Sequence, residues 1–246
     1  MKPIFLLIAF IVMTSVSAQV IKNEVSTGQA KHPNLPLVDL NSRLQDKFNA
    51  VNYQGYYLAN ASLPDVSGSP FPFEDAIIII NTTDGKSYKV PNGNYNASTD
   101  EVVSNFAKDS SFVFQSKTIK SVKFDKYTAT RYKDKNDKDH FYFELTPHAS
   151  IRLLKKYSAK VIDGQINVLT KQKTSSDMFS LSDSYGITID DKTVTEFKLN
   201  KKSVLKLLSN HKKLIQDFVK NENLSYKEEY DVIRILNYYS VISKSN

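Results

Sequence analysis

Hydrophobic and polar residues are arranged over most of this chain as in short β-strands. The clearest unit is a hairpin, in which the β-branched segment 76–81 leads through Thr83-Asp84-Gly85-Lys86, an Asp-Gly turn, into the returning segment 87–90. Four consecutive isoleucines at 77–80 predict that the first of these strands is buried on both faces or lies in a barrel wall.

Further strand-like segments follow one another with no helical stretch between them. They are 53–63, 101–106, 111–114, 118–124, 140–145, 151–162, 177–181, 186–189 and 193–199. Because consecutive strands without crossover helices pair antiparallel, this order predicts a mainly antiparallel sheet, either a meander or an incomplete barrel.

After Leu199 the hydrophobic period becomes helical. Apolar residues recur at helical spacing within 201–209, within 211–221 and in a last segment that contains Val232, Ile235, Leu236, Tyr239 and Ile242. Ser225-Tyr226-Lys227-Glu228 matches a capping box and predicts that Ser225 caps the last helix. The fold class predicted is therefore α+β, with a β-rich domain at 51–199 and C-terminal helices at 200–246 packed on it.

The first residues are typical of a secretory signal peptide, predicted at 1–18. Its apolar run, 4–13, is followed by Val16-Ser17-Ala18, which resembles a cleavage site. As a helix this run would rise only ~15 Å, about half the thickness of a bilayer core. We expect a periplasmic or secreted protein with no transmembrane span after signal cleavage. Residues 19–50 are expected to form a polar leader and a short helix.

Composition narrows the chemistry that the chain can carry. The 246 residues include no cysteine, which excludes disulfides, zinc–thiolate sites, iron–sulfur clusters and a thiol nucleophile. A chain of this length can bury enough apolar surface to fold without disulfides. Export without cysteine fits a bacterial envelope or secreted protein.

Several short motifs between residues 68 and 243 carry a family resemblance. They are Gly68-Ser69-Pro70-Phe71, Glu74-Asp75, Asp84-Gly85-Lys86-Ser87-Tyr88, Val90-Pro91, Tyr95-Asn96-Ala97-Ser98-Thr99-Asp100-Glu101, Leu153-Leu154-Lys155-Lys156-Tyr157, Lys201-Lys202-Ser203-Val204-Leu205, Tyr230-Asp231-Val232-Ile233 and Asn237-Tyr238-Tyr239. Their order and spacing resemble a family of exported Bacteroidetes proteins that has no assigned activity. One departure is Asn92-Gly93-Asn94, where a shorter, partly apolar link is expected. The resemblance implies export and a β-rich body with a helical tail, and it implies no site residue.

Catalytic motifs are weak. Two S-x-x-K matches, beginning at Ser203 and Ser209, are expected by chance in a chain this rich in serine and lysine, and the partner motifs of penicillin-recognising enzymes are absent. Adjacent acids such as Asp100-Glu101 point to opposite faces of a strand. A glycosidase-type site would need acids from different strands, for example Glu101 with Glu144.

Metal-binding signals are equally weak. Asp134-Lys135-Asn136-Asp137-Lys138-Asp139 resembles a calcium loop, but it lacks the central glycine, and Leu145 stands where the bidentate glutamate is required. We interpret it as a hairpin tip. His140 and His148 are too far apart along one strand to share a metal. No cofactor and no metal are predicted.

Lysine and arginine gather in three stretches. The stretch 117–140 contains eight of them and four aspartates. The stretch 150–176 contains six and one acid, and the stretch 197–213 contains six and no acid. Such clusters attract anionic partners. Without RNP motifs, zinc knuckles or a helix-turn-helix, no nucleic-acid partner is expected. An envelope protein and an anionic glycan or lipid surface remain the partners to consider.

Together these observations favour an exported, non-catalytic binding or structural module of unknown ligand. The alternative is a carboxylate-based hydrolase acting on an envelope or extracellular polymer. The sequence does not decide whether the chain is an enzyme, although a non-catalytic role is favoured. It assigns no catalytic, cofactor-binding or metal-binding residue.

Overall fold

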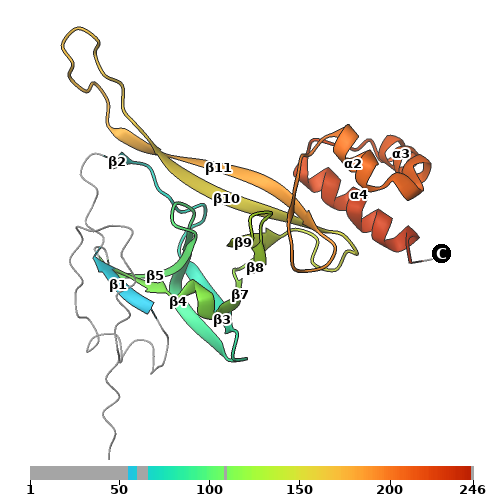
Figure 1. Ribbon diagram of the computed structural model, residues 1–246, viewed down its shortest axis with the longest axis horizontal. Helices are drawn as coiled ribbons and strands as arrows, with labels where there is room; N and C mark the ends of the chain where they lie inside the picture. Colours follow the sequence, from blue (N-terminus) through green and yellow to red (C-terminus); the bar gives the residue numbers. More distant parts are fainter. Residues whose placement is uncertain (1–54, 60–65, 108–109, 245–246) are drawn as a thin grey trace, which may run out of the picture. The chain divides into compact units, whose positions relative to one another are not determined.

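The computed structural model describes residues 55–59, 66–107 and 110–244, and Figure 1 shows them as one long antiparallel β-sheet followed by helices. The α+β fold class with a C-terminal helical segment is confirmed, and the sheet is open rather than a closed barrel. The predicted signal peptide, polar leader and first helix lie outside the described residues.

The sheet has twelve strands. They are β1 (Gly55–Ala59), β2 (Val66–Ser67), β3 (Ala76–Thr82), β4 (Ser87–Asn96), β5 (Glu101–Ala107), β6 (Ser110–Phe114), β7 (Ile119–Lys123), β8 (Thr128–Lys133), β9 (Asp139–Glu144), β10 (Arg152–Ile162), β11 (Asp177–Thr188) and β12 (Thr195–Phe197). Their order is β1-β6-β5-β4-β3-β7-β8-β9-β10-β11-β12, and β2 adds a short parallel pairing to β11. Two meanders, β3–β6 and β7–β12, therefore meet where β7 pairs with β3.

The isoleucine run shows which face of the sheet is the core. Ile78 and Ile80 are fully buried, whereas Ile77 is 58% exposed and Ile79 is 38% exposed. The prediction that this strand is buried on both faces is therefore wrong, because successive side chains of a strand point to opposite faces and only one face of β3 is covered. Strand β8 was not predicted, because its residues are Thr, Ala, Arg, Tyr and Lys and do not form a clear alternation of apolar and polar positions.

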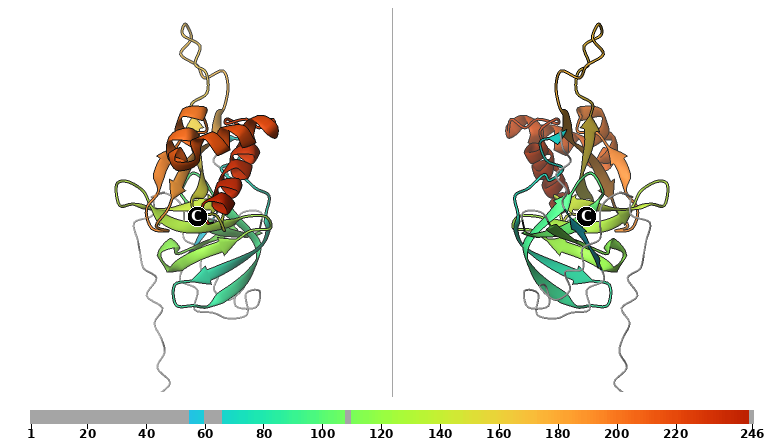
Figure 2. Two further views of the ribbon diagram at one scale, coloured as in Figure 1. Left: turned by 90° about the vertical axis from the view of Figure 1, so that its right-hand side faces the viewer. Right: turned by 90° about the vertical axis from the view of Figure 1, so that its left-hand side faces the viewer.

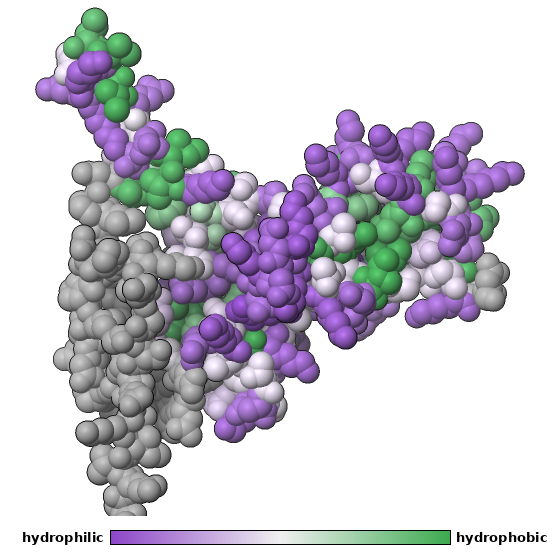
Figure 3. Space-filling view, in the orientation of Figure 1, coloured by the Kyte–Doolittle hydropathy of each residue, from purple (hydrophilic) through white to green (hydrophobic). Residues whose placement is uncertain are grey.

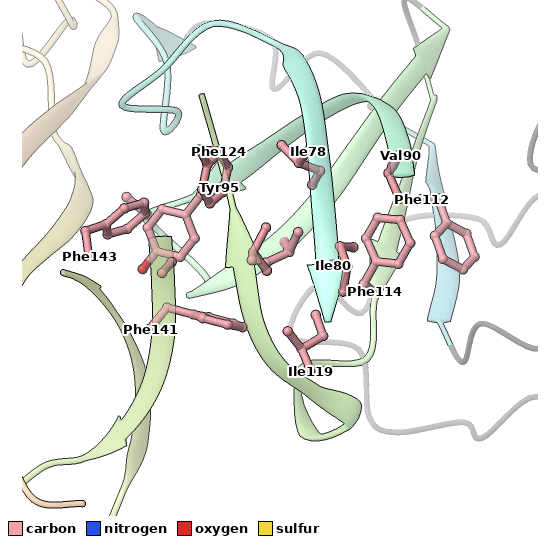
Figure 4. Close-up of a cluster of buried hydrophobic side chains, with 14 of the residues drawn as sticks. Ile78, Ile80, Val90, Tyr95, Phe112, Phe114, Ile119, Phe124, Phe141 and Phe143 are labelled. Atoms are coloured by element: carbon pink, nitrogen blue, oxygen red, sulfur yellow. The ribbon is translucent and has the colours of Figure 1, made fainter. Parts of the chain in front are cut away.

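The main core lies on the inner face of β3–β10 (Figure 4). Its members alternate with outward-facing residues along each strand, as in Ile78 and Ile80 of β3 or Phe141 and Phe143 of β9. The ring of Phe143 lies within 5.2 Å of Tyr95 and 5.1 Å of Tyr157, centroid to centroid, in edge-to-face geometry. Edge-to-face contacts of this kind add to the free energy gained by burial alone.

A second core joins the helices to the sheet. These are α2 (Lys201–Leu207), η2 (Ser209–His211), α3 (Lys212–Asn221) and α4 (Glu229–Ile242). Fully buried Leu208, Ile215 and Leu236 belong to the same cluster as Leu153 of β10 and Phe197 of β12. Among the described helices, none is both long and apolar enough to cross a membrane.

The helix starts differ from the prediction. Asn200 caps α2, because its side-chain oxygen accepts a hydrogen bond from the Ser203 N–H at 2.8 Å. Ser225 does not cap the last helix, which begins only at Glu229 and has no side-chain cap. The Ser225 hydroxyl instead accepts from the N–H of Lys227. The residues between Ser225 and Glu229 form a bend before the helix starts, so the capping-box spacing falls outside the helix.

The Asp-Gly turn between β3 and β4 lowers the pKa of Asp84, which can be tested by titration. The hydroxyl of Thr82 donates to the Asp84 carboxylate, and Lys86 pairs with it at 3.0 Å, which together lower the Asp84 pKa to about 2. The stabilisation from ionised Asp84 is therefore present above the unfolded pKa of ~4 and is lost as the pH falls from ~4 to ~2. NMR titration of the carboxyl carbon should show this low pKa, and Thr82→Val should raise it.

Thr83→Val is the matched control for this titration, because the Thr83 hydroxyl faces the Thr118 carbonyl and not Asp84. An Asp84 pKa near 4 in the unmodified protein would contradict the proposed turn geometry.

Candidate functional site

The acids considered for a hydrolase have separate partners. Glu101 accepts a hydrogen bond from the Tyr56 hydroxyl at 3.2 Å. Glu144 accepts one from the Tyr132 hydroxyl at 2.9 Å and lies 3.7 Å from Arg152. No contact joins these two described acids, so they supply no assembled carboxylate pair.

His140 and the calcium-loop candidate are held in ordinary structural contacts, and His148 is exposed. His140 Nδ1 lies 2.9 Å from Asp100, and its Nε2 lies 3.6 Å from Asp134. Asp134 is at the tip of the β8–β9 hairpin, where its carboxylate accepts from the N–H groups of Asn136 and Lys138, so the hairpin interpretation is confirmed. Within the described ranges, no cluster of three or more metal-ligating side chains is arranged to hold an ion.

A polar network connects α4 to the β10–β11 ribbon. Lys155 Nζ lies 2.7 Å from Glu229 and 3.2 Å from Asp183, and the Tyr185 hydroxyl donates to the same Glu229 oxygen at 2.7 Å. Burial by itself lowers the pKa of Lys155, but the bond to Glu229 and the neighbouring charges outweigh it and raise that pKa. Burial and the Glu229 bond raise the pKa of Tyr185. Each polar group of this network has a partner within it, so we assign the network a role in stability.

The β10–β11 ribbon is long and mostly without neighbouring strands. The two strands pair continuously from Arg152 opposite Thr188 to Ile162 opposite Met178. β9 pairs with only two residues of β10, and β12 pairs with only three residues of β11. The ribbon then continues into the loop 163–176, which Figures 1 and 2 draw clear of the other described elements.

Hydrogen bonds within this loop keep it narrow. The N–H of Asn167 donates to the Gln172 carbonyl at 2.9 Å, and the N–H of Lys171 donates to the Asn167 carbonyl at 2.8 Å. The Asn167 side chain accepts from the N–H groups of Leu169 and Thr170, which closes the turn. At the base, Gly164 is required, because a Cβ there would overlap the Ser175 carbonyl. The loop therefore has a defined apex at 167–172.

Three apolar side chains are exposed at or beside this apex. Ile166 is 59% exposed, Val168 is 77% exposed and Leu169 is 92% exposed. Figure 3 shows hydrophobic residues gathered at the end of the hairpin. From 164 to 176 the only charged residues are Lys171 and Lys173. Because exposed apolar clusters often mark contact surfaces, we define Ile166, Val168 and Leu169 as the apex patch.

A second surface feature is a basic hollow on the helices. It has a volume of about 770 Å³ and is lined by Lys201, Lys202, Leu205, Lys206, Ser209 and Lys212. Two of these lysines lie in the first turn of α2 and one begins α3, where the helix dipole disfavours a cation by about 0.3–1 kcal/mol each. The sequence showed the lysine cluster but not the hollow.

The S-x-x-K matches fall in this same region without forming a nucleophile pair. Ser203 lies in the first turn of α2 as a backbone donor to Asn200, and Lys206 is exposed. Ser209 and Lys212 line the hollow, and no hydrogen bond joins these two described side chains. The apex patch was not predicted, because the chain between 163 and 176 is too polar to indicate that the hairpin continues there. No family model, no curated protein and no solved structure matches this chain.

Proposed function

We propose that this chain is an exported, non-catalytic binding module that contacts a lipid bilayer with anionic headgroups through its apex patch. Membership of the exported Bacteroidetes family is part of the same proposal. The observation that carries it is the position of Val168 and Leu169 at the end of a hydrogen-bonded hairpin, with most of their surface in water. A folded protein gains nothing in stability from holding such side chains outward.

The chemistry of the loop favours a bilayer over a protein surface. Full burial of a Val, Leu or Ile side chain is worth about 1.5–3 kcal/mol, so three of them give a reversible interfacial contact. Lys171 adds attraction of about 1 kcal/mol near an anionic surface, whereas Lys173 is already paired with Asp177 at the base of the loop. A stable protein–protein interface needs about 800 Å² per partner, which is more than three side chains supply.

Vesicle sedimentation tests this proposal. The mature protein should bind vesicles rich in phosphatidylglycerol more tightly than vesicles of phosphatidylcholine alone. The Val168→Ser/Leu169→Ser variant should lose about tenfold or more in partition coefficient, because two apolar side chains no longer leave water. Ile77→Ser removes a similarly exposed isoleucine from the sheet and should leave binding unchanged.

Equal binding by the Val168→Ser/Leu169→Ser variant and the unmodified protein would overturn the bilayer proposal. So would the absence of binding to every vesicle composition. Retention of an envelope protein by the apex patch in a salt-resistant complex would replace the bilayer with a protein partner.

A further inference from the structure

We propose that the basic hollow formed by Lys201, Lys202, Lys206 and Lys212 binds a phosphate group carried by a larger molecule. The site is separate from the apex patch and does not depend on the function proposed for it. Figure 3 shows hydrophilic residues along the outer side of the helical segment, with hydrophobic residues beside them. The four lysines line one hollow together with Ser209 and Leu205, which is buried.

The first step of the argument is that these charges are not neutralised. None of the four lysines has an ion pair or hydrogen bond to a described side chain, and the segment 197–213 contains no acid. Some other surface lysines are paired, as Lys133 is with Asp137 and Lys173 is with Asp177. Like charges around one hollow repel each other, and a bound anion removes that repulsion.

The second step concerns the kind of anion. Lysine presents a compact point charge with three donors, whereas the planar fork of arginine suits bidentate carboxylates. Four lysines without arginine therefore suit a compact, multiply charged oxyanion such as a phosphate. The hollow is a shallow depression that opens widely to solvent. It leaves room for the group that carries the phosphate, either a sugar or the headgroup of a lipid.

Calorimetric titration with inorganic pyrophosphate provides the first test. We expect saturable binding to the mature protein that weakens as salt is raised, and a loss of at least tenfold in affinity for Lys201→Glu/Lys202→Glu. The control is Lys126→Glu/Lys135→Glu, which changes the net charge equally with two exposed lysines outside the hollow. The control should retain its affinity within twofold.

Thermal unfolding separates loss of a site from loss of the fold. Lys201 and Lys202 lie in the first turn of α2, where an acid is preferred to a lysine. Lys201→Glu/Lys202→Glu should therefore keep or raise the unfolding temperature while it loses pyrophosphate binding. Equal losses in the hollow variant and the control variant would overturn the proposal, as would no heat of binding at millimolar pyrophosphate.

Two further arms identify the source of the phosphate. A soluble or glycan-borne phosphate is indicated by two results together. Glucose 1-phosphate competes with pyrophosphate for binding, and Lys201→Glu/Lys202→Glu leaves binding to vesicles unchanged. A lipid headgroup is indicated if the Val168→Ser/Leu169→Ser variant still binds phosphatidylglycerol vesicles weakly. Adding Lys201→Glu/Lys202→Glu to that variant should then abolish the remaining binding. Either result supports the phosphate site, and failure of the apex patch leaves the pyrophosphate result unaffected.

Discussion

Phe143→Ala is expected to lower the free energy of unfolding by about 3–5 kcal/mol, the largest effect we expect from one side chain. Phe143 is fully buried and its ring contacts Phe73, Tyr95, Phe124 and Tyr157. Truncation removes both the burial of the ring and its edge-to-face contacts, and it leaves a cavity between strands. Urea unfolding followed by tyrosine fluorescence measures the loss, and the unfolding temperature should fall by about 10 °C.

The control for this experiment is Ile79→Ala on the outer face of β3. Ile79 is outside the buried clusters, so its truncation should cost about 1 kcal/mol or less. If Phe143→Ala were no more destabilising than Ile79→Ala, the inner face of β3–β10 would not be the packed core.

The second large effect is expected where α4 meets the ribbon. Lys155→Met leaves Glu229 and Asp183 without their common cation in a partly buried site, which should cost about 2–3 kcal/mol. Glu229→Gln should cost a similar amount, and the double variant should cost less than the sum, with a coupling of about 1–2 kcal/mol in a double-mutant cycle.

An exposed ion pair provides the comparison. Arg234 pairs with Glu222 at 2.7 Å on the surface of the helices. Arg234→Met should change stability by less than about 1 kcal/mol, because water screens exposed charges. Strict additivity of Lys155→Met and Glu229→Gln would contradict a shared network.

The same network sets an alkaline limit to stability. The folded-state pKa values of Lys155 and Tyr185 are both raised, so the folded protein retains two protons that the unfolded chain releases near pH ~10. Their contribution is complete below that pH and is lost as the pH rises toward the folded-state values. Denaturant midpoints measured between pH 9 and pH 11 should fall, and they should fall less steeply in Lys155→Met.

Local signals in the sequence predicted the parts of the fold that depend on neighbouring residues. The Asp-Gly hairpin, the antiparallel pairing of the strands and the C-terminal helices all follow from turn chemistry and hydrophobic period, whereas the order of the strands does not. Features that depend on distant partners did not follow. One example is the burial of only one face at Ile77 and Ile79, because sequence does not show what covers a strand. Another is the position of Ser225 outside α4, which the turn before Glu229 decides.

The candidate sites were predictable to different degrees. The lysines of the basic hollow all lie between 201 and 212, so their cluster was visible in the sequence, but their lack of acidic partners depends on how α2 and α3 pack. The apex patch was not visible at all. The eleven-residue pairing of β10 with β11 places this patch at the end of a hairpin. The chain between 163 and 176 is too polar to indicate that the hairpin continues. In both cases the site is defined by tertiary structure, which local sequence patterns do not show.

The pairing of β3 with β7 has a consequence for how the chain folds. Strand β3 acquires β4 from the adjacent hairpin, but its other edge stays bare until Ser121 pairs with Asn81, after β5 and β6 have been made. An edge of four consecutive isoleucines is the kind of segment that adds to another chain and nucleates aggregation. Arrival of β7 is thus the step that ends the exposure of this edge. Chains that stall between β4 and β7 during synthesis are the ones that we expect to aggregate.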